Sequence, residues 1–174
     1  MSATKRIIVK SGAAGTAAAL TAAALLAFTG GTASAKSGTL RFFSKSVTSS
    51  FYTANGQPIT NQNTQPAVGD YLISSDLDYV GNHKSHAKSY TATDNLVCTI
   101  SVSTSTSIMG ICDGAIAMGG SMLLASHETV NFAATSPVVP INGGVGQFNG
   151  AHGTVKTVQV GNTNNSDITV SYTT

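Results

Sequence analysis

The sequence is poor in charge, and this shortage limits the partners that the protein can have. Only 9% of its 174 residues are charged. Three of the nine basic residues, Lys5, Arg6 and Lys10, lie in the first ten positions, which leaves six scattered cations against seven acids and a net charge near −1. A chain without a basic stripe lacks the electrostatic signature of nucleic-acid binding. We therefore expect no nucleic-acid partner.

The chain also lacks an apolar run long enough for a membrane-spanning helix. Its alanine-rich run, residues 13–28, has about 16 residues, whereas a spanning helix needs about 20. Basic residues precede this run, and Ala33-Ser34-Ala35 follows it as an A-x-A cleavage signal. This order is typical of a secretory signal peptide. We predict that residues 1–35 are removed and that the domain 36–174 is secreted, without a stable membrane anchor.

Cysteine is scarce, because Cys98 and Cys112 are the only two. An exported protein meets oxidising conditions, so a disulfide is expected. The residues between them read as strand, Ser/Thr turn and strand, which predicts that the two thiols face each other across a hairpin. Such a bridge closes a loop of about 15 residues and contributes about 3 kcal/mol in the chain-entropy model. The alternative is two free thiols or metal ligands.

We expect neither a metal site nor a cofactor. Two cysteines do not supply the four ligands of a typical zinc site. His83 and His86 flank a predicted turn near Asp78 and are an alternative metal site. Histidines at a turn are more often simply exposed to solvent.

Helical periodicity is absent after residue 35, and strand patterns replace it. The mature chain of 139 residues has the size of one domain. Polar turns separate its short strand-like stretches, as in an antiparallel sandwich or barrel, two folds that alternation alone does not separate. The predicted strands cover residues 39–51, 69–79, 85–93, 95–103, 108–118, 122–132, 155–160 and 168–172.

A glycine-rich stretch precedes the predicted strand 155–160. It does not predict a nucleotide site, because position 149 is Asn and breaks G-x-G-x-x-G, and no G-K-[ST] follows. Glycines more simply let a barrel strand bend and let backbones approach closely. The predicted structural glycines are Gly143, Gly144, Gly146, Gly150 and Gly153.

This stretch, INGGVGQFNGAHGTV, resembles the signature I-T-G-G-x-G-x-[FY]-x-G-A-x-G-x-V of allene oxide cyclases and dirigent proteins, with Asn142 in place of Thr. GDYLISSDLDY and LVCTISV are similar to two further strands of the cyclases. The resemblance implies an all-β, eight-stranded antiparallel barrel with an apolar lumen. It further implies that a small apolar ligand binds in the lumen and that the barrel steers its cyclisation or coupling without a cofactor, in the manner of an isomerase. A homo-oligomer is compatible with the resemblance.

The resemblance also implies candidate site residues. Asp76 stands where the cyclases carry a pocket asparagine, and a carboxyl in an apolar lumen has a raised pKa and can act as an acid or base. We expect Asp76, Tyr79, Ile100 and Phe148 to contact the ligand, although Asp76 and Tyr79 share a face only if a bulge intervenes. The alternative for Asp76 is a solvated position at a strand end.

Two further alternatives concern function. The first strand region has no acid where the cyclases place a glutamate, and Ser44 to Ser46 fall there instead. Allene oxide cyclase activity itself is therefore not expected. The alternative to a protein that steers cyclisation or coupling is a non-catalytic secreted ligand carrier, or a structural or interaction protein. An open lumen with Asp76 pointing inward would favour chemistry, and a purely apolar lumen would favour carriage.

Overall fold

A computed structural model describes residues 35–61 and 63–174. The predicted signal peptide therefore lies outside the described residues, apart from Ala35. Strands are the regular secondary structure of the described part apart from one 3-10 turn, η1 (Gly146–Phe148), and no helix in it is long and apolar enough to span a membrane. Its strands are β1 (Ser37–Tyr52), β2 (Tyr71–Asn82), β3 (Ser85–His86), β4 (Ala92–Thr104), β5 (Ser107–Met118), β6 (Ser121–Asn131), β7 (Val138–Ile141), β8 (Gly143–Val145), β9 (His152–Gln159) and β10 (Ser166–Thr173).

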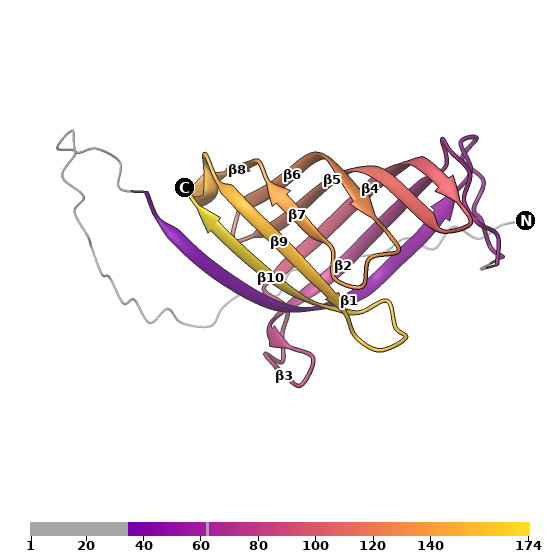
Figure 1. The fold of residues 1–174 in the computed structure, drawn as a ribbon. Coiled ribbons are helices and arrows are strands. Elements are labelled where there is room, and N and C mark those ends of the chain that lie inside the picture. The colour runs from indigo at the N-terminus through magenta and orange to yellow at the C-terminus, as the bar shows by residue number, and fades with distance from the viewer. Residues whose placement is uncertain (1–34, 62) are drawn as a thin grey trace, which may run out of the picture. The chain divides into compact units, whose positions relative to one another are not determined.

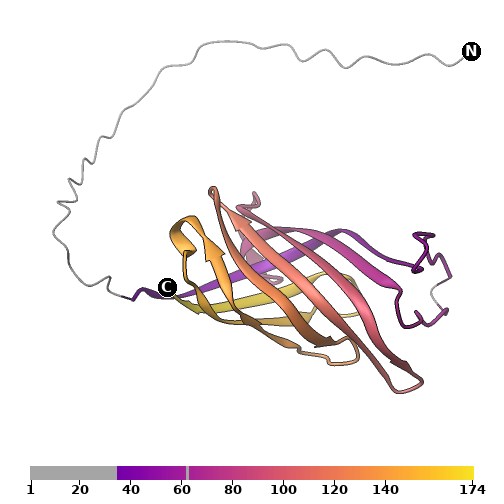
Figure 2. The same ribbon diagram turned by 90° about the horizontal axis from the view of Figure 1, so that it is seen from above.

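The strands form a nearly closed antiparallel barrel, in the order β7-β9-β10-β1-β2-β4-β5-β6-β8 (Figures 1 and 2). β1 is long enough to pair with β10 along its first half and with β2 along its second half. The path has nine strands among the described residues, one more than predicted, because a single bent segment adds both β7 and β8 while the predicted strand 85–93 does not join the path. The prediction of a β-barrel is confirmed.

Two strand predictions need correction. The stretch 85–93 forms only the two-residue strand β3, which pairs with β2 off the main path, while residues 92 and 93 belong to β4. Residues 85–91 are all exposed, so no buried face holds them in a sheet. β7 and β8 were not predicted because Pro140 and the paired glycines interrupt their strand pattern.

The segment 138–145 closes the barrel through Asn142, the residue that departs from the glycine signature. β7 pairs with β9, and β8 pairs with β6, so the two ends of the sheet lie on one segment. The Asn142 side chain donates to the Ser126 carbonyl over 2.7 Å and to Glu128 Oε1 over 3.0 Å, and its Oδ1 accepts from the Ser126 N–H over 3.0 Å. The side-chain amide thus extends the pairing of β6 where the backbone ladder stops.

The glycine stretch allows backbones to approach closely at the seam, the place where the segment 138–145 joins the two ends of the sheet. A Cβ on Gly144 would lie 2.2 Å from the Phe148 carbonyl oxygen, and one on Gly153 would lie 2.0 Å from that of Ser171. Gly146 and Gly150 have positive φ angles, which only glycine adopts readily. Gly143 is the exception, because a Cβ there would make ordinary 3.7 Å contact with Leu124.

Two apolar clusters fill much of the barrel interior. One contains Phe42, Ile116, Leu123, Phe148 and Val170, and the other contains Leu72 and Val130 around the two cysteines. Cys98 and Cys112 are cross-strand partners on β4 and β5 and form the predicted disulfide. Both are essentially inaccessible, at 0% and 1% exposure. The prediction of a hairpin disulfide is confirmed.

Candidate functional site

The barrel interior contains a cavity of about 360 Å³. This volume lies within the range of small-molecule sites, roughly 300–1,000 Å³. Apolar side chains from both interior clusters form most of its wall, with β4, β5, β6, β7, β9 and β10 contributing Leu96, Ile116, Val130, Val139, Val155 and Ile168. The lumen is therefore not filled by side chains.

Two carboxyl groups supply the charged part of the cavity wall. Asp76 on β2 and Asp94 on β4 are cross-strand partners, and both line the cavity. The Ser44 hydroxyl on β1 lies 3.1 Å from Asp94 Oδ2 and 3.5 Å from Asp76 Oδ2. Because this hydroxyl carries one proton, it cannot donate to both carboxylates at once. The Ser74 hydroxyl lies 3.4 Å from Asp76 Oδ1.

A third carboxyl group lies beside this pair, on Asp78. Alternation along β2 puts it on the same inner face as Asp76. Asp78 is fully buried, and among the described residues neither of its carboxyl oxygens has a partner in good hydrogen-bond geometry, although the Ser44 hydroxyl is close enough to oppose the rise in its pKa. Buried, unpartnered polar groups are rare and costly. We refer to Asp76, Asp78 and Asp94 as the acid cluster.

Burial raises the pKa of every carboxyl in the acid cluster. It raises the pKa of Asp94 to about 8, with the negative charges of Asp78 and Asp76 adding to the effect. It raises the pKa of Asp78 to about 6, and that of Asp76 also lies above its usual range, although serine hydroxyls oppose the shift there. At neutral pH the Asp94 carboxyl, with a pKa of about 8, is thus predominantly protonated, whereas the Asp78 carboxyl, with a pKa of about 6, is predominantly ionised. The three side chains do not form a group that could hold a metal ion.

The first strand brings hydroxyl groups, and no carboxyl, next to the acid cluster. Ser44 and Ser46, at the predicted position of the missing glutamate, are the register partners of Asp78 and Asp76. β1 therefore provides a hydroxyl at this point, and β2 and β4 provide the carboxyls. Asp94 escaped prediction because the fourth strand was expected to begin at residue 95. Its even spacing from Cys98 and Ile100 is the signal that places it on the inner face.

Of the four predicted ligand contacts, Asp76 is the one that lines the cavity in the described part of the chain. Ile100 is 1% exposed, but it lies away from the cavity, and its backbone pairs with Gly69 and Asp70 at the end of the 53–70 loop. Phe148 is buried against Tyr172, with ring centroids 5.2 Å apart. Neither of these two side chains belongs to the cavity lining.

Tyr79 lies on the outer face of β2, as its odd spacing from Asp76 requires in a regular strand. Its ring packs near Phe43, His86 and Tyr90, at centroid distances of 6.4, 5.3 and 6.4 Å. No bulge interrupts β2 between Asp76 and Tyr79 in its pairing with β1. Tyr79 therefore does not reach the cavity, and the expectation that it would do so is corrected.

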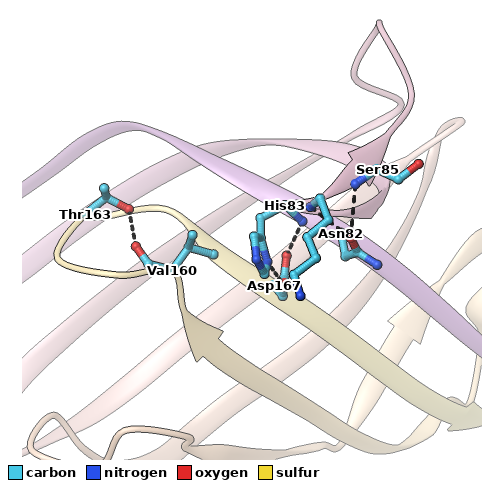
Figure 3. Close-up of polar contacts among 7 residues, drawn as sticks. Asn82, His83, Ser85, Val160, Thr163 and Asp167 are labelled. Atoms are coloured by element: carbon cyan, nitrogen blue, oxygen red, sulfur yellow. Dashed lines mark hydrogen bonds and ion pairs between the residues drawn. The ribbon is translucent and has the colours of Figure 1, made fainter.

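The two turn histidines do not converge on a metal site. His83 folds over β1 and pairs with Asp167 on β10, with 2.6 Å between Nδ1 and Oδ2 and a 2.7 Å bond from its backbone N–H to Oδ1 (Figure 3). His86 stacks on Phe43 at 4.8 Å. Asp78 faces the barrel interior. These contacts fasten the β2–β3 hairpin across the outside of the barrel.

Comparison with solved structures places this architecture among known folds. Neither a protein-family model nor a curated protein matches the sequence. A pyocyanin demethylase matches the structure with a TM-score of 0.56 and 17% identity, over 78% of this chain and 99% of that chain. The fold is that of the allene oxide cyclase and dirigent-like barrels.

Two dirigent-like barrels from the same comparison are pterocarpan synthase dirigent proteins. GePTS1 matches with a TM-score of 0.54 and 17% identity, over 80% of this chain and 84% of that chain. PsPTS1 matches with a TM-score of 0.51 and 15% identity, over 79% of this chain and 94% of that chain. At these identities the likeness concerns the fold, and the chemistry has to be argued from the cavity and its acid cluster.

Proposed function

We propose that this dirigent-like barrel is a secreted protein whose lumen binds a small, largely apolar molecule and steers its cyclisation or coupling without a cofactor. The observation that carries the proposal is the 360 Å³ apolar cavity with Asp76 and Asp94 in its wall. A lumen filled with bulky side chains would leave no room for a ligand. A lumen with only apolar walls would favour passive carriage.

The acid cluster contains the groups that proton-transfer chemistry needs. The most effective acids and bases have pKa values near the working pH, and burial brings the pKa of Asp94 to about 8 and that of Asp78 to about 6. In our proposal the protonated Asp94 carboxyl donates a proton to one atom of the ligand, and the Asp76 carboxylate accepts a proton from another. Ligand and product then have the same composition, as in an isomerisation that closes a ring.

The apolar walls would supply the rest of the rate enhancement by holding the ligand in one folded shape. Orientation of reacting atoms accounts for a large part of many enzymatic accelerations. The names of the three structural neighbours agree with chemistry in such a barrel, since one is a demethylase and two are synthases.

The binding part of the proposal can be tested with N-phenyl-1-naphthylamine, a neutral apolar dye that fluoresces in apolar surroundings. The mature protein should enhance its fluorescence saturably. Ala125→Trp, which inserts an indole at a residue of the cavity wall, should abolish the enhancement. Ile111→Trp adds the same ring on the outer face, where the side chain is already 46% exposed, and should leave binding unchanged. Equal binding by both variants would place the dye outside the lumen and contradict the proposal.

The chemical part can be tested on the natural ligand. Native mass spectrometry of the mature protein from its producing culture should show an adduct of small-molecule mass that Ala125→Trp lacks. The unaltered protein should convert this compound to an isomer, and Asp94→Asn should slow conversion by about 10²-fold or more while retaining binding. Binding without conversion by the unaltered protein would leave the ligand carrier as the correct function.

A further inference from the structure

The charges around the lumen have one sign only. The acid cluster faces the interior from β2 and β4. The residues next to it on β1 and those that line the cavity on the other strands are neutral: Ser44 and Ser46 from β1, Ile116 from β5, Leu123 from β6, Thr157 from β9 and Ser166 from β10. Among the described residues that line the cavity there is no lysine, arginine or histidine. In the part of the chain that the structure describes, no salt bridge pairs a member of the acid cluster with a cation.

The hydrogen bonds of the acid cluster do not replace such a cation. Asp76 and Asp94 are direct cross-strand partners, an arrangement in which two like charges destabilise a sheet. Ser44 offers a single proton to the pair. Asp78 is 0% exposed, and neither of its carboxyl oxygens has a partner in good hydrogen-bond geometry within residues 35–61 and 63–174. Carboxylates buried to this degree are nearly always paired with a cation or fully hydrogen-bonded.

The acid cluster adjoins the cavity. Two members of the acid cluster are in the cavity wall, and the third shares their inner face. A positively charged group at the acid-cluster end of the cavity would compensate the buried carboxylates. The apolar remainder of the cavity would at the same time hold an uncharged body.

We propose that the natural ligand of the lumen is an organic cation, a protonated amine or a quaternary nitrogen on an apolar body, with its charge held at the acid cluster. This inference rests on the proposed function, in that it takes the lumen as the ligand site. It also selects among ligands. A carboxylate or phosphate of the same shape is repelled by the acid cluster, and a neutral analogue leaves the buried carboxylates uncompensated.

Cation binding is coupled to proton release. A positive charge beside a carboxyl stabilises the ionised form and lowers its pKa. Because burial has raised the pKa of Asp94 to about 8, binding near neutral pH releases this proton from a fraction of the complexes, and Asp94 can act as the acid in the complexes that keep it. Affinity for the cation therefore rises with pH, because fewer protons must be displaced.

Three probes with one naphthalene body test the inference by calorimetry: (1-naphthylmethyl)trimethylammonium, 1-naphthylmethanol and 1-naphthylacetate. At about pH 8 the cation should bind about tenfold or more tighter than the alcohol, which is about 1.4 kcal/mol or more, and the carboxylate should show no binding. Near neutral pH, titration of the cation in two buffers of different ionisation enthalpy should reveal net proton release.

Variants assign the preference to the acid cluster. Asp76→Asn/Asp94→Asn should lose most of the preference for the cation and still bind the alcohol, which also shows that the barrel is folded. Asp113→Asn removes an exposed carboxylate of β5, 58% exposed in its side chain, and should leave all three affinities unchanged. The inference is overturned if the alcohol binds as tightly as the cation, or if the carboxylate binds comparably. If no probe binds and the apolar dye also fails to bind, the lumen is not a ligand site and the proposed function fails as well.

Discussion

Adjacent glycines in the seam of the barrel have different steric roles, and this contrast can be measured. A Cβ on Gly144 would lie 2.2 Å from the Phe148 carbonyl oxygen, a backbone atom that cannot move aside, whereas a Cβ on Gly143 has room. We expect Gly144→Ala to lower the free energy of unfolding by roughly 1–3 kcal/mol, as overpacking does. Gly143→Ala should be close to neutral. Urea denaturation of the two variants checks the prediction, and equal midpoints would contradict it.

The buried Asp78 carboxyl should make stability depend on pH. Its pKa in the folded protein, about 6, lies above the ordinary value of 3.8, so the folded state binds this proton more tightly than the unfolded state does. The resulting stabilisation is fully present below about pH 4 and is lost as pH rises through about 6. Because the pKa of Asp94 in the folded protein is about 8, this residue extends the loss of stability up to about pH 8. We therefore expect the melting temperature to fall between about pH 5 and pH 8.

Asp78→Asn isolates this effect, because an amide has the shape of the carboxyl and does not titrate in that range. The variant should show a smaller fall in melting temperature over the same pH interval than the unaltered protein. Thermal unfolding followed by circular dichroism at several pH values gives both slopes. Parallel slopes for the two proteins would mean that Asp78 keeps an ordinary pKa in the folded state.

At the scale of elements, the seam between β6 and the segment 138–145 is held by the Asn142 side chain through three hydrogen bonds. Asn142→Ala removes these three hydrogen bonds, and because the groups are exposed and water can replace the amide, we expect a loss of about 0.5–1.5 kcal/mol in the free energy of unfolding. Hydrogen exchange should quicken most at the amides of β6 and β8. Asn149→Ala alters an exposed asparagine whose side chain makes no hydrogen bond in the described structure. This control should change neither the free energy of unfolding nor the rate of hydrogen exchange in β6 and β8. Loss of stability without faster local exchange would show that Asn142 does not hold the seam.

The sequence predicted those elements whose faces alternate between core and solvent. The strands around Cys98 and Ile168 alternate clearly, and the disulfide followed from facing positions on one hairpin. The β7 and β8 segment could not be read in this way, because Pro140 and the glycines hide its strand character and its pairing depends on partners far along the chain. The acid cluster was only partly predictable for a related reason. Asp76 was found through the resemblance. The place of Asp94 beside it, and the lack of hydrogen-bond partners for Asp78 among the described residues, depend on which side chains β1, β2 and β4 bring together.

At the scale of the whole molecule, the predicted cleavage point coincides with the start of the barrel. Lys36, the first residue after the predicted cut, pairs with Thr174 through two backbone hydrogen bonds of 2.8 and 3.2 Å, and β1 begins at Ser37. Removal of residues 1–35 would thus leave every described strand intact. The proposal of a secreted domain and the geometry of the barrel therefore divide the chain at the same residue.

Intact mass spectrometry of the exported protein tests this division directly. We expect the mass of residues 36–174, reduced by about two daltons for the disulfide between Cys98 and Cys112. Ala35→Phe should block cleavage, because the A-x-A signal needs small residues, and the uncleaved chain should stay with the cell membrane fraction. Release of the full-length chain from the unaltered protein would refute the assignment of residues 1–35 as a signal peptide. Release of the same mature mass from both proteins would instead show that cleavage does not depend on the small residue at position 35. In either case the barrel and its acid cluster would stand.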